Sequence, residues 1–225
     1  MTNFNFGQLA SKWWNPNGAM RSLHDINIPR VKFIKNNISN NHKNVLDIGC
    51  GAGILAEALT KIELKVTGID TSKELIAIAQ SHAKIDNLPI QYKNISIADY
   101  TKSHSKQFDI VTCLELIEHL ENPEELIKSI AKFCNPGGRA FISTINKTFT
   151  AWLLGIVAAE HILNIIPKGT HSFEGFIKPS KLKSIASKYN LTLTNASGID
   201  YNPFSRQANQ SNNLDINYIL CFTKN

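Results

Sequence analysis

The sequence predicts an α/β fold with a doubly wound, mostly parallel sheet of seven strands. From residue 44 onward, short apolar strand patterns alternate with helical patterns, as in proteins whose helices cover both faces of a parallel sheet. A glycine-rich turn over residues 49–53 joins the first of these strands to the first helix, at the position where such sheets bind ligands. The chain has 225 residues, and we expect 1–225 to form a single domain.

Two helices, 6–14 and 22–36, are expected before the sheet, because the turn-forming residues Asn15-Pro16-Asn17-Gly18 separate two helical patterns. They would form an N-terminal cap over residues 1–40. The remaining expected elements are, in order, strand 44–48, helix 53–61, strand 64–69, helix 72–84, strand 90–94, strand 108–113, helix 123–134, strand 138–145, helix 179–189, strand 191–199 and strand 215–223.

Local signals support several of these elements. The segment Thr71-Ser72-Lys73-Glu74 supplies a helix cap, and the apolar residues of the helix that follows share one face. Pro136-Gly137-Gly138 indicates a turn just before a strand. The polar residues 209–213 indicate a loop between the last two strands.

A helical insertion, 148–175, is expected to interrupt the alternation after the fifth strand. Its apolar part, 148–166, is shorter than the ~20 apolar residues that span a bilayer. At helical spacing, Glu160, Asn164 and Lys168 form a polar stripe on an otherwise apolar segment. Two interpretations remain open: an amphipathic helix that lies in a membrane interface, or a helix packed on the domain or over the active site.

Composition limits the partners of the chain. The net charge of +6 would permit an anionic partner, but the lysines are scattered and form no basic run, so nucleic-acid binding is not expected. The four cysteines form no C-x-x-C pair, which predicts free thiols in a reducing compartment. The first residues show no signal-peptide pattern, so a cytoplasmic location is expected.

The glycine-rich turn indicates the cofactor. Asp47, Gly49, Gly51 and Gly53 form the pattern D-x-G-x-G-x-G, which differs from the dinucleotide fingerprint G-x-G-x-x-G. An acid at the tip of the strand repels pyrophosphate but suits a positively charged ligand such as S-adenosylmethionine. Asp70 closes the next strand, where it would bind a ribose diol. The pattern resembles that of the class I methyltransferases, and these five residues are expected to bind S-adenosylmethionine.

The expected catalytic residues follow the fourth strand. On a helical turn, Glu115, Glu118 and His119 would lie on one face, at positions i, i+3 and i+4. Such a triplet could bind a divalent cation, or His119 could act as a general base held by a carboxylate. His171, in a glycine-containing loop, is a further candidate for the substrate pocket, and His24 is another histidine to consider.

A wider resemblance rests on motifs spread nearly end to end along the chain. They are Ser11-Lys12-Trp13-Trp14, Leu23-His24-Asp25-Ile26-Asn27, Pro29-Arg30, the glycine-rich turn, Gly68-Ile69-Asp70, Glu115-Leu116-Ile117-Glu118-His119, Ser143-Thr144-Ile145-Asn146, Trp152-Leu153-Leu154, Pro167-Lys168-Gly169-Thr170-His171, Phe176-Ile177-Lys178-Pro179, Tyr201-Asn202-Pro203 and Asn217-Tyr218. With these motifs the chain resembles the ubiquinone-biosynthesis O-methyltransferases, which have a Rossmann-like class I methyltransferase fold.

The resemblance implies methylation of a phenolic hydroxyl on polyprenylated catechol-type intermediates, in two O-methylation steps of ubiquinone synthesis. It implies that Arg30, Gly49, Asp70 and Leu114 contact the cofactor. It also implies a divalent cation, Mg²⁺, at the triplet of residues 115, 118 and 119. The segment 148–166 would meet the inner face of the membrane, where the isoprenoid tail resides, and other ubiquinone-biosynthesis proteins are further expected partners.

The expected reaction is a direct displacement, in which the phenolate oxygen attacks the methyl carbon of the sulfonium. Either a metal or His119 alone would activate the hydroxyl. The alternative enzyme is a class I methyltransferase that acts on a soluble small molecule. A cofactor-sensing module is disfavoured by the E-x-x-E-H triplet. A methyltransferase of nucleic-acid amines is disfavoured because Leu114-Glu115-Leu116 stands where an Asn-Pro-Pro-Tyr type motif would be expected.

Overall fold

The computed structural model describes residues 13–18, 20–120, 122–148 and 175–225. Its helices are α1 (Arg21–Asn36), α2 (Ile54–Thr60), α3 (Lys73–Ile85), α4 (Ile97–Ser103), α5 (Pro123–Phe133) and α7 (Pro179–Ser187), with the short 3₁₀ helix η2 (Ile117–His119). Its strands are β1 (Asn44–Ile48), β2 (Lys65–Asp70), β3 (Gln91–Asn94), β4 (Phe108–Leu114), β5 (Cys134–Ile145), β6 (Leu191–Asn202), β7 (Gln207–Ser211) and β8 (Asn217–Lys224).

The strands form one sheet in the order β3-β2-β1-β4-β5-β8-β6-β7. The pairs from β3 to β5 are parallel, and the three pairs beyond β5 are antiparallel. The strand order reverses at β1, because β2 lies on one side of it and β4 on the other. Ligands bind at such a reversal, beyond the carboxyl ends of the strands. The topology therefore brings the ends of β1, β2 and β4 together at one edge.

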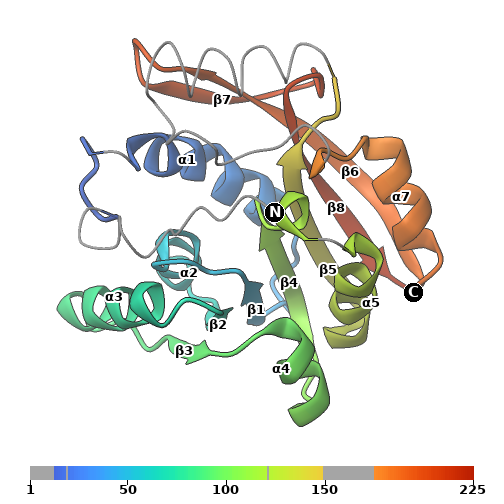
Figure 1. Ribbon diagram of the computed structural model, residues 1–225, viewed down its shortest axis with the longest axis horizontal. Coiled ribbons are helices and arrows are strands. Elements are labelled where there is room, and N and C mark those ends of the chain that lie inside the picture. Colours follow the sequence, from blue (N-terminus) through green and yellow to red (C-terminus); the bar gives the residue numbers. More distant parts are fainter. Residues whose placement is uncertain (1–12, 19, 121, 149–174) are drawn as a thin grey trace.

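Helices cover both faces of this sheet (Figure 1). Helices α1, α2 and α3 pack on one face through a buried cluster that includes Ile34 and Leu59. Helices α5 and α7 pack on the other face through a cluster that includes Ile127 and Leu182. Neighbouring strand residues such as Val45 and Leu46 belong to opposite clusters, because successive side chains of a strand point to opposite faces. The expected doubly wound architecture is confirmed.

Several local predictions are also confirmed. The side chain of Ser72 caps α3 by accepting a hydrogen bond from the backbone N–H of Leu75. All four cysteines are buried free thiols. The turn expected at Pro136-Gly137-Gly138 is wrong, because these residues lie inside β5, where the β4–β5 register jumps from Phe108↔Cys134 to Ile110↔Arg139.

The count of seven strands is wrong, because the sheet has eight. Residues 209–213 were expected to form a loop, but most of them belong to β7, an edge strand that pairs only with β6 among the described strands. This strand lies at the rim of the sheet and none of its residues is buried. It therefore lacks the apolar alternation by which strands are identified in a sequence.

Helix α4 was also missed. It has only one buried residue, Tyr100, so no apolar stripe marks it. Its signal is a cap: the Ser96 hydroxyl accepts a hydrogen bond from the backbone N–H of Asp99 and donates one to that residue's carboxylate.

Part of the N-terminal prediction and all of the insertion lie outside the described residues. Of the expected helix 6–14, only Trp13 and Trp14 are described, and they form a turn rather than a helix. The second expected helix, 22–36, corresponds to α1. The segment 149–174, which holds most of the expected insertion and His171, is not described. Among the helices in the described ranges, none combines the length and apolar character needed to cross a bilayer.

Candidate active site

The glycine-rich turn after β1 is tightly folded. Gly49, Gly51 and Gly53 all have positive φ, at 73°, 54° and 91°, a region that side chains with a Cβ rarely adopt. The N–H of Gly49 donates to the carbonyl of Ile69 at 2.9 Å, which ties the turn to the end of β2. The turn is therefore held in a shape that only glycine adopts without strain.

Asp47 lies at the carboxyl end of β1 and is 2% exposed. Its Oδ1 accepts a hydrogen bond of 2.7 Å from the Thr112 hydroxyl of β4. Its Oδ2 is buried and has no hydrogen-bond partner among the described residues. Burial raises the pKa of Asp47 to about 7, the Thr112 hydrogen bond acts against this rise, and the charge of Asp70 adds to it. The Asp47 carboxylate therefore has an oxygen that can contact a cationic partner.

Asp70 ends β2 beside the same turn. Its Oδ2 accepts a hydrogen bond from the backbone N–H of Gly51, and its Oδ1 accepts one from that of Ser72. Each carboxylate oxygen can accept a second hydrogen bond. The two backbone contacts therefore fix the orientation of the carboxylate and leave lone pairs for a ligand such as a ribose diol.

The chain leaves β4 through a strained residue. Glu115 has a φ of 53°, which is uncommon for a residue with a side chain, and such outliers collect at functional sites. Its carboxylate is paired with the guanidinium of Arg30 from α1 and accepts a 2.8 Å hydrogen bond from the Ser143 hydroxyl of β5. The strained backbone thus directs a carboxylate into contact with residues from two other elements.

Glu118, in η2, is buried at 8% exposure. Its Oε2 accepts a 2.9 Å hydrogen bond from the Thr144 hydroxyl, while its Oε1 is buried without a hydrogen-bond partner among the described residues. Burial raises the pKa of Glu118 well above the usual range of a glutamate, and the nearby charge of Glu115 raises it further. The two carboxyl groups therefore form an interacting pair.

His119 is the last residue of η2. The expectation of one helical face was wrong, because Glu115 lies in a left-handed conformation before η2 and the triplet does not occupy one α-helical turn. His119 has an exposed side chain, whereas Glu118 is buried. Within the described ranges, no three His, Cys, Asp or Glu side chains are arranged to hold a metal ion. The structure therefore brings together two members of the triplet.

The remaining expected residues lie around this edge of the sheet. Leu114 is the last residue of β4 and is half-buried. Arg30 is 7% exposed, and its Nε has no hydrogen-bond partner among the described residues. His24 bonds to the carbonyl of Trp13 at 2.9 Å and lies edge-on to Trp14. Both contacts are with residues 13–18, which we call the N-terminal segment.

Two site residues, Ser143 and Thr144, were not singled out from the sequence for any role. Their hydroxyls hold Glu115 and Glu118, respectively. Both are less than 2% exposed. Two polar residues in succession at the end of an apolar strand were an available signal, because buried hydroxyls need partners.

The sequence of the chain is similar to those of known methyltransferases. A family model described as a methyltransferase domain matches residues 23–196. The ubiquinone biosynthesis O-methyltransferase of Hydrogenovibrio crunogenus is 42% identical over 98% of this chain and 91% of its own length. The protein of the same name from Coxiella burnetii (strain RSA 493) is 45% identical over 97% of this chain and 93% of its own length.

Solved structures show the same fold at low identity. Magnesium protoporphyrin IX methyltransferase from Synechocystis PCC 6803, with bound S-adenosylhomocysteine (SAH), has a TM-score of 0.67 and 18% identity, over 99% of this chain and 89% of that chain. The plantazolicin methyltransferase, in complex with a substrate analogue and SAH, has a TM-score of 0.69 and 17% identity, over 97% and 90%.

Proposed function

The chain belongs to the ubiquinone biosynthesis O-methyltransferases, and from this membership we propose that Glu115 and Glu118 activate the phenolic hydroxyl that it methylates. The chain is an S-adenosylmethionine-dependent O-methyltransferase of ubiquinone biosynthesis, and its substrate is a polyprenylated phenol. The observation that carries the proposal is the interacting pair of carboxyl groups at the end of β4, one of which is buried with a raised pKa.

A raised carboxyl pKa suits this reaction. A catechol hydroxyl ionises well above neutral pH, and a base works best when its pKa lies near the working pH. In the proposed step, the Glu118 carboxylate accepts the phenolic proton. The phenolic oxygen forms a bond to the methyl carbon, the carbon–sulfur bond breaks, and its electron pair stays on sulfur as SAH leaves. The remaining task of the protein is to hold oxygen, carbon and sulfur in line.

For the cofactor, we propose that the residues at the ends of β1, β2 and β4 bind S-adenosylmethionine. The Oδ2 of Asp47, which has no hydrogen-bond partner in the described part of the chain, supports a contact with the cationic part of the ligand. The fixed carboxylate of Asp70 supports a contact with the ribose. The turn of Gly49, Gly51 and Gly53 allows close approach of the backbone, while Arg30 and Leu114 complete the proposed site.

The second part of the proposal is a divalent cation, Mg²⁺. Mg²⁺ is commonly held by one or two carboxylates together with waters and substrate oxygens. Glu115 and Glu118 supply two carboxylates, and Oε1 of Glu118 is buried with no hydrogen-bond partner from the described ranges. These two residues would hold the ion, with His119 beside them in the sequence. When bound, the ion would supply a Lewis acid that lowers the pKa of the hydroxyl.

Chelation separates the two parts of this proposal. The purified enzyme, treated exhaustively with a chelator, is expected to lose methylation of a short-prenyl catechol and to regain it with added Mg²⁺. The assay is mass analysis of the product. Activity that survives chelation and does not rise with Mg²⁺ would contradict the metal role and leave Glu118 as a metal-free base. If His119→Gln loses methylation activity and Glu118→Gln keeps it, the base is His119 instead.

Replacing Asp47 with asparagine is expected to stabilise the fold at neutral pH and to weaken cofactor binding. Burial raises the folded-state pKa of Asp47 to about 7, from 3.8. The contribution of this carboxyl to stability is therefore fully present below pH 3.8 and is lost as the pH rises toward 7. Across this window the free energy of unfolding of the variant should rise by a few kcal/mol relative to that of the wild type, as measured by denaturant unfolding at several pH values.

The binding half of that prediction is measured by calorimetry with S-adenosylmethionine. Asparagine keeps the volume of the side chain but removes the charge that would face the cation, so the Kd is expected to rise about tenfold. Such a trade between stability and function is typical of binding residues. An Asp47→Asn variant that is no more stable at pH 7 than at pH 4, relative to wild type, would contradict the account of Asp47.

We also propose that the segment 148–166 contacts the inner face of the membrane, where a polyprenylated substrate resides. We further propose that other ubiquinone-biosynthesis proteins are partners there. The apolar residues and the polar stripe of this segment support that reading. The wild type is expected to sediment with anionic liposomes, and a variant with Trp152→Asp and Leu153→Asp is expected to stay in the supernatant. A wild type that never sediments would leave the segment as a lid or a packed helix.

A further inference from the structure

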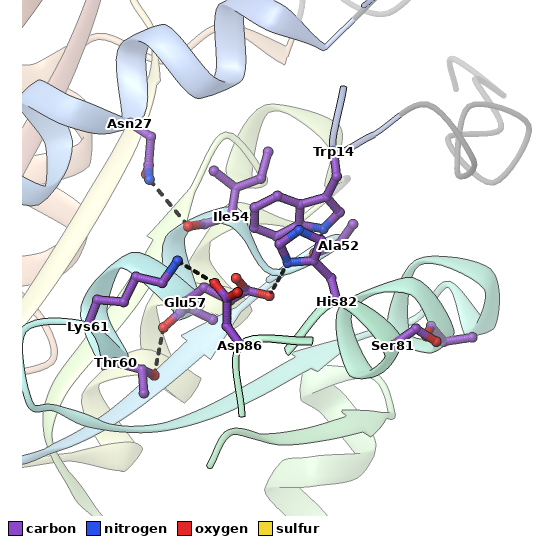
Figure 2. A network of polar contacts seen from close by, with 12 residues as sticks. Trp14, Asn27, Ala52, Ile54, Glu57, Thr60, Lys61, Ser81, His82 and Asp86 are labelled. Carbon is purple, nitrogen blue, oxygen red and sulfur yellow. Dashed lines mark hydrogen bonds and ion pairs between the residues drawn. The ribbon is translucent and has the colours of Figure 1, made fainter. Parts of the chain in front are cut away.

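Trp14 contacts the glycine-rich turn and two histidine rings, and Figure 2 shows it beside Ala52 and His82. Its indole Nε1–H donates a 2.9 Å hydrogen bond to the carbonyl of Ala52, inside the glycine-rich turn. Its ring stacks on the His82 ring of α3, with centroids 3.5 Å apart and planes 3° apart. The His24 ring meets it edge-on at 5.7 Å. Trp14 therefore joins the N-terminal segment to the turn and to α3.

A carboxylate of α2 also holds the His82 ring, through a ring nitrogen. Its Nδ1 lies 2.8 Å from Oε1 of Glu57, whose side chain is 2% exposed. Burial raises the pKa of Glu57, while the hydrogen bond and charge of His82 act against that rise. A buried carboxylate is costly without such a partner. We call Trp14, His82, Glu57 and the Ala52 carbonyl the Trp14 clasp.

The clasp holds a neighbouring aromatic ring over the turn. Trp13 is 7% exposed, and its indole is so close to Gly51 that a Cβ built there would lie 3.4 Å from the ring. Asn27 of α1 adds a hydrogen bond to the carbonyl of Ile54, the first residue of α2. The N-terminal segment thus covers the proposed cofactor turn, and α1 is bonded to the start of α2 directly after that turn.

A second set of bonds fixes the start of α1 and the segment before it. Arg206 donates to both carboxylate oxygens of Asp25 and to the carbonyl of Pro16. The Tyr201 hydroxyl donates to Asp25 as well. The start of α1 and the segment before it are therefore anchored at the antiparallel end of the sheet, and the Trp14 clasp fastens that segment to the glycine-rich turn.

We propose that Trp14 is a positioning residue for the cofactor: by holding the glycine-rich turn and the Trp13 ring beside it, the clasp sets the affinity for S-adenosylmethionine and SAH. Trp14 donates to a carbonyl of the turn itself, so its loss frees the part of the turn between Gly51 and Gly53. A flexible site must be ordered when the ligand binds, which weakens affinity. The methyl-transfer step depends on other residues and is left unchanged. The inference rests on the cofactor site, and not on the proposed roles of Glu115 and Glu118.

The test compares SAH binding by calorimetry in the wild type and in Trp14→Ala, Trp14→Phe and His82→Gln, with steady-state kinetics at varied S-adenosylmethionine. Trp14→Phe keeps a ring over His82 but removes the donor to Ala52. We expect the SAH Kd to rise about tenfold in Trp14→Ala and about threefold in each of the other two. The KM for S-adenosylmethionine should rise in parallel, while kcat at saturation stays within about twofold.

Ser81→Ala is the matched control, because Ser81 is an exposed neighbour of His82 whose hydroxyl donates a hydrogen bond to the carbonyl of Ala77 within α3. It should bind SAH like the wild type. Thermal unfolding checks that each variant is folded, and if Trp14→Ala is not, Trp14→Phe decides. Unchanged SAH affinity in the folded Trp14 variants, or a fall in kcat at unchanged KM, would overturn the proposal. A wild type that binds no SAH would instead contradict the methyltransferase assignment itself.

Discussion

Replacing Glu118 with glutamine is expected to lower kcat by ~100-fold or more, the usual contribution of a general base. Glutamine has nearly the same shape and can still meet the Thr144 hydroxyl, but it cannot accept the phenolic proton or hold a cation. The fold should survive, because an uncharged side chain removes the electrostatic cost of a carboxylate that is 8% exposed. The measurement is the steady-state rate with a short-prenyl catechol at saturating S-adenosylmethionine.

The pH profile of the wild type gives a second readout for this carboxyl. The base must be ionised to act, so kcat should rise as the pH passes through the pKa of Glu118. Burial and the charge of Glu115 raise that pKa, and the rising limb should therefore lie at higher pH than for an ordinary glutamate. Glu125→Gln, on the exposed face of α5, makes the same chemical change away from the site. Equal rates for Glu118→Gln and this control would contradict the proposed role.

Replacing Gly53 with alanine is expected to destabilise the protein by ~2–4 kcal/mol, the sum of backbone strain and overpacking. Gly53 has a φ of 91°, where a Cβ is strained. An added Cβ would also overlap the Tyr92 hydroxyl of β3 and lie 3.3 Å from the Cβ of Ala79. The free energy of unfolding from denaturant titrations measures the loss, and cofactor affinity should fall with it because the turn is displaced.

A double variant separates the two causes. The Tyr92 hydroxyl is buried without a hydrogen-bond partner among the described residues, so Tyr92→Phe alone should be neutral or slightly stabilising. In the Gly53→Ala background, Tyr92→Phe should recover the part of the loss that comes from the overlap, ~1–2 kcal/mol. Purely additive effects of the two substitutions would show that strain alone accounts for the loss.

The central architecture could be predicted because local sequence patterns mark its helices and strands. The buried face of α3 follows a period of 3.6. The strands around Val45 and Val111 are short apolar runs, as expected for strands covered on both faces, and the glycine-rich turn marks the binding edge. Elements without a buried face gave no such signal: β7 has no buried residue and α4 has one. The boundary residues of strands remained approximate for the same reason.

The site was predictable in composition but not in geometry. The residue types at 115, 118 and 119 suggested a helical face, whereas the left-handed Glu115 and the 3₁₀ turn place two carboxyl groups together and leave the side chain of His119 exposed. The partners Arg30, Ser143 and Thr144 come from distant parts of the chain. Their contacts depend on tertiary packing, which spacing along a sequence does not encode.

The most direct measurement is one incubation of the purified protein with S-adenosylmethionine and a short-prenyl catechol, analysed by mass. The account predicts a product that is heavier by one methyl group on a phenolic oxygen, formed in equal amount with SAH. It also predicts that an unprenylated catechol is turned over more slowly. No methylated product, or equal turnover of a bare catechol, would contradict the assignment of this chain to methylation of a polyprenylated phenol.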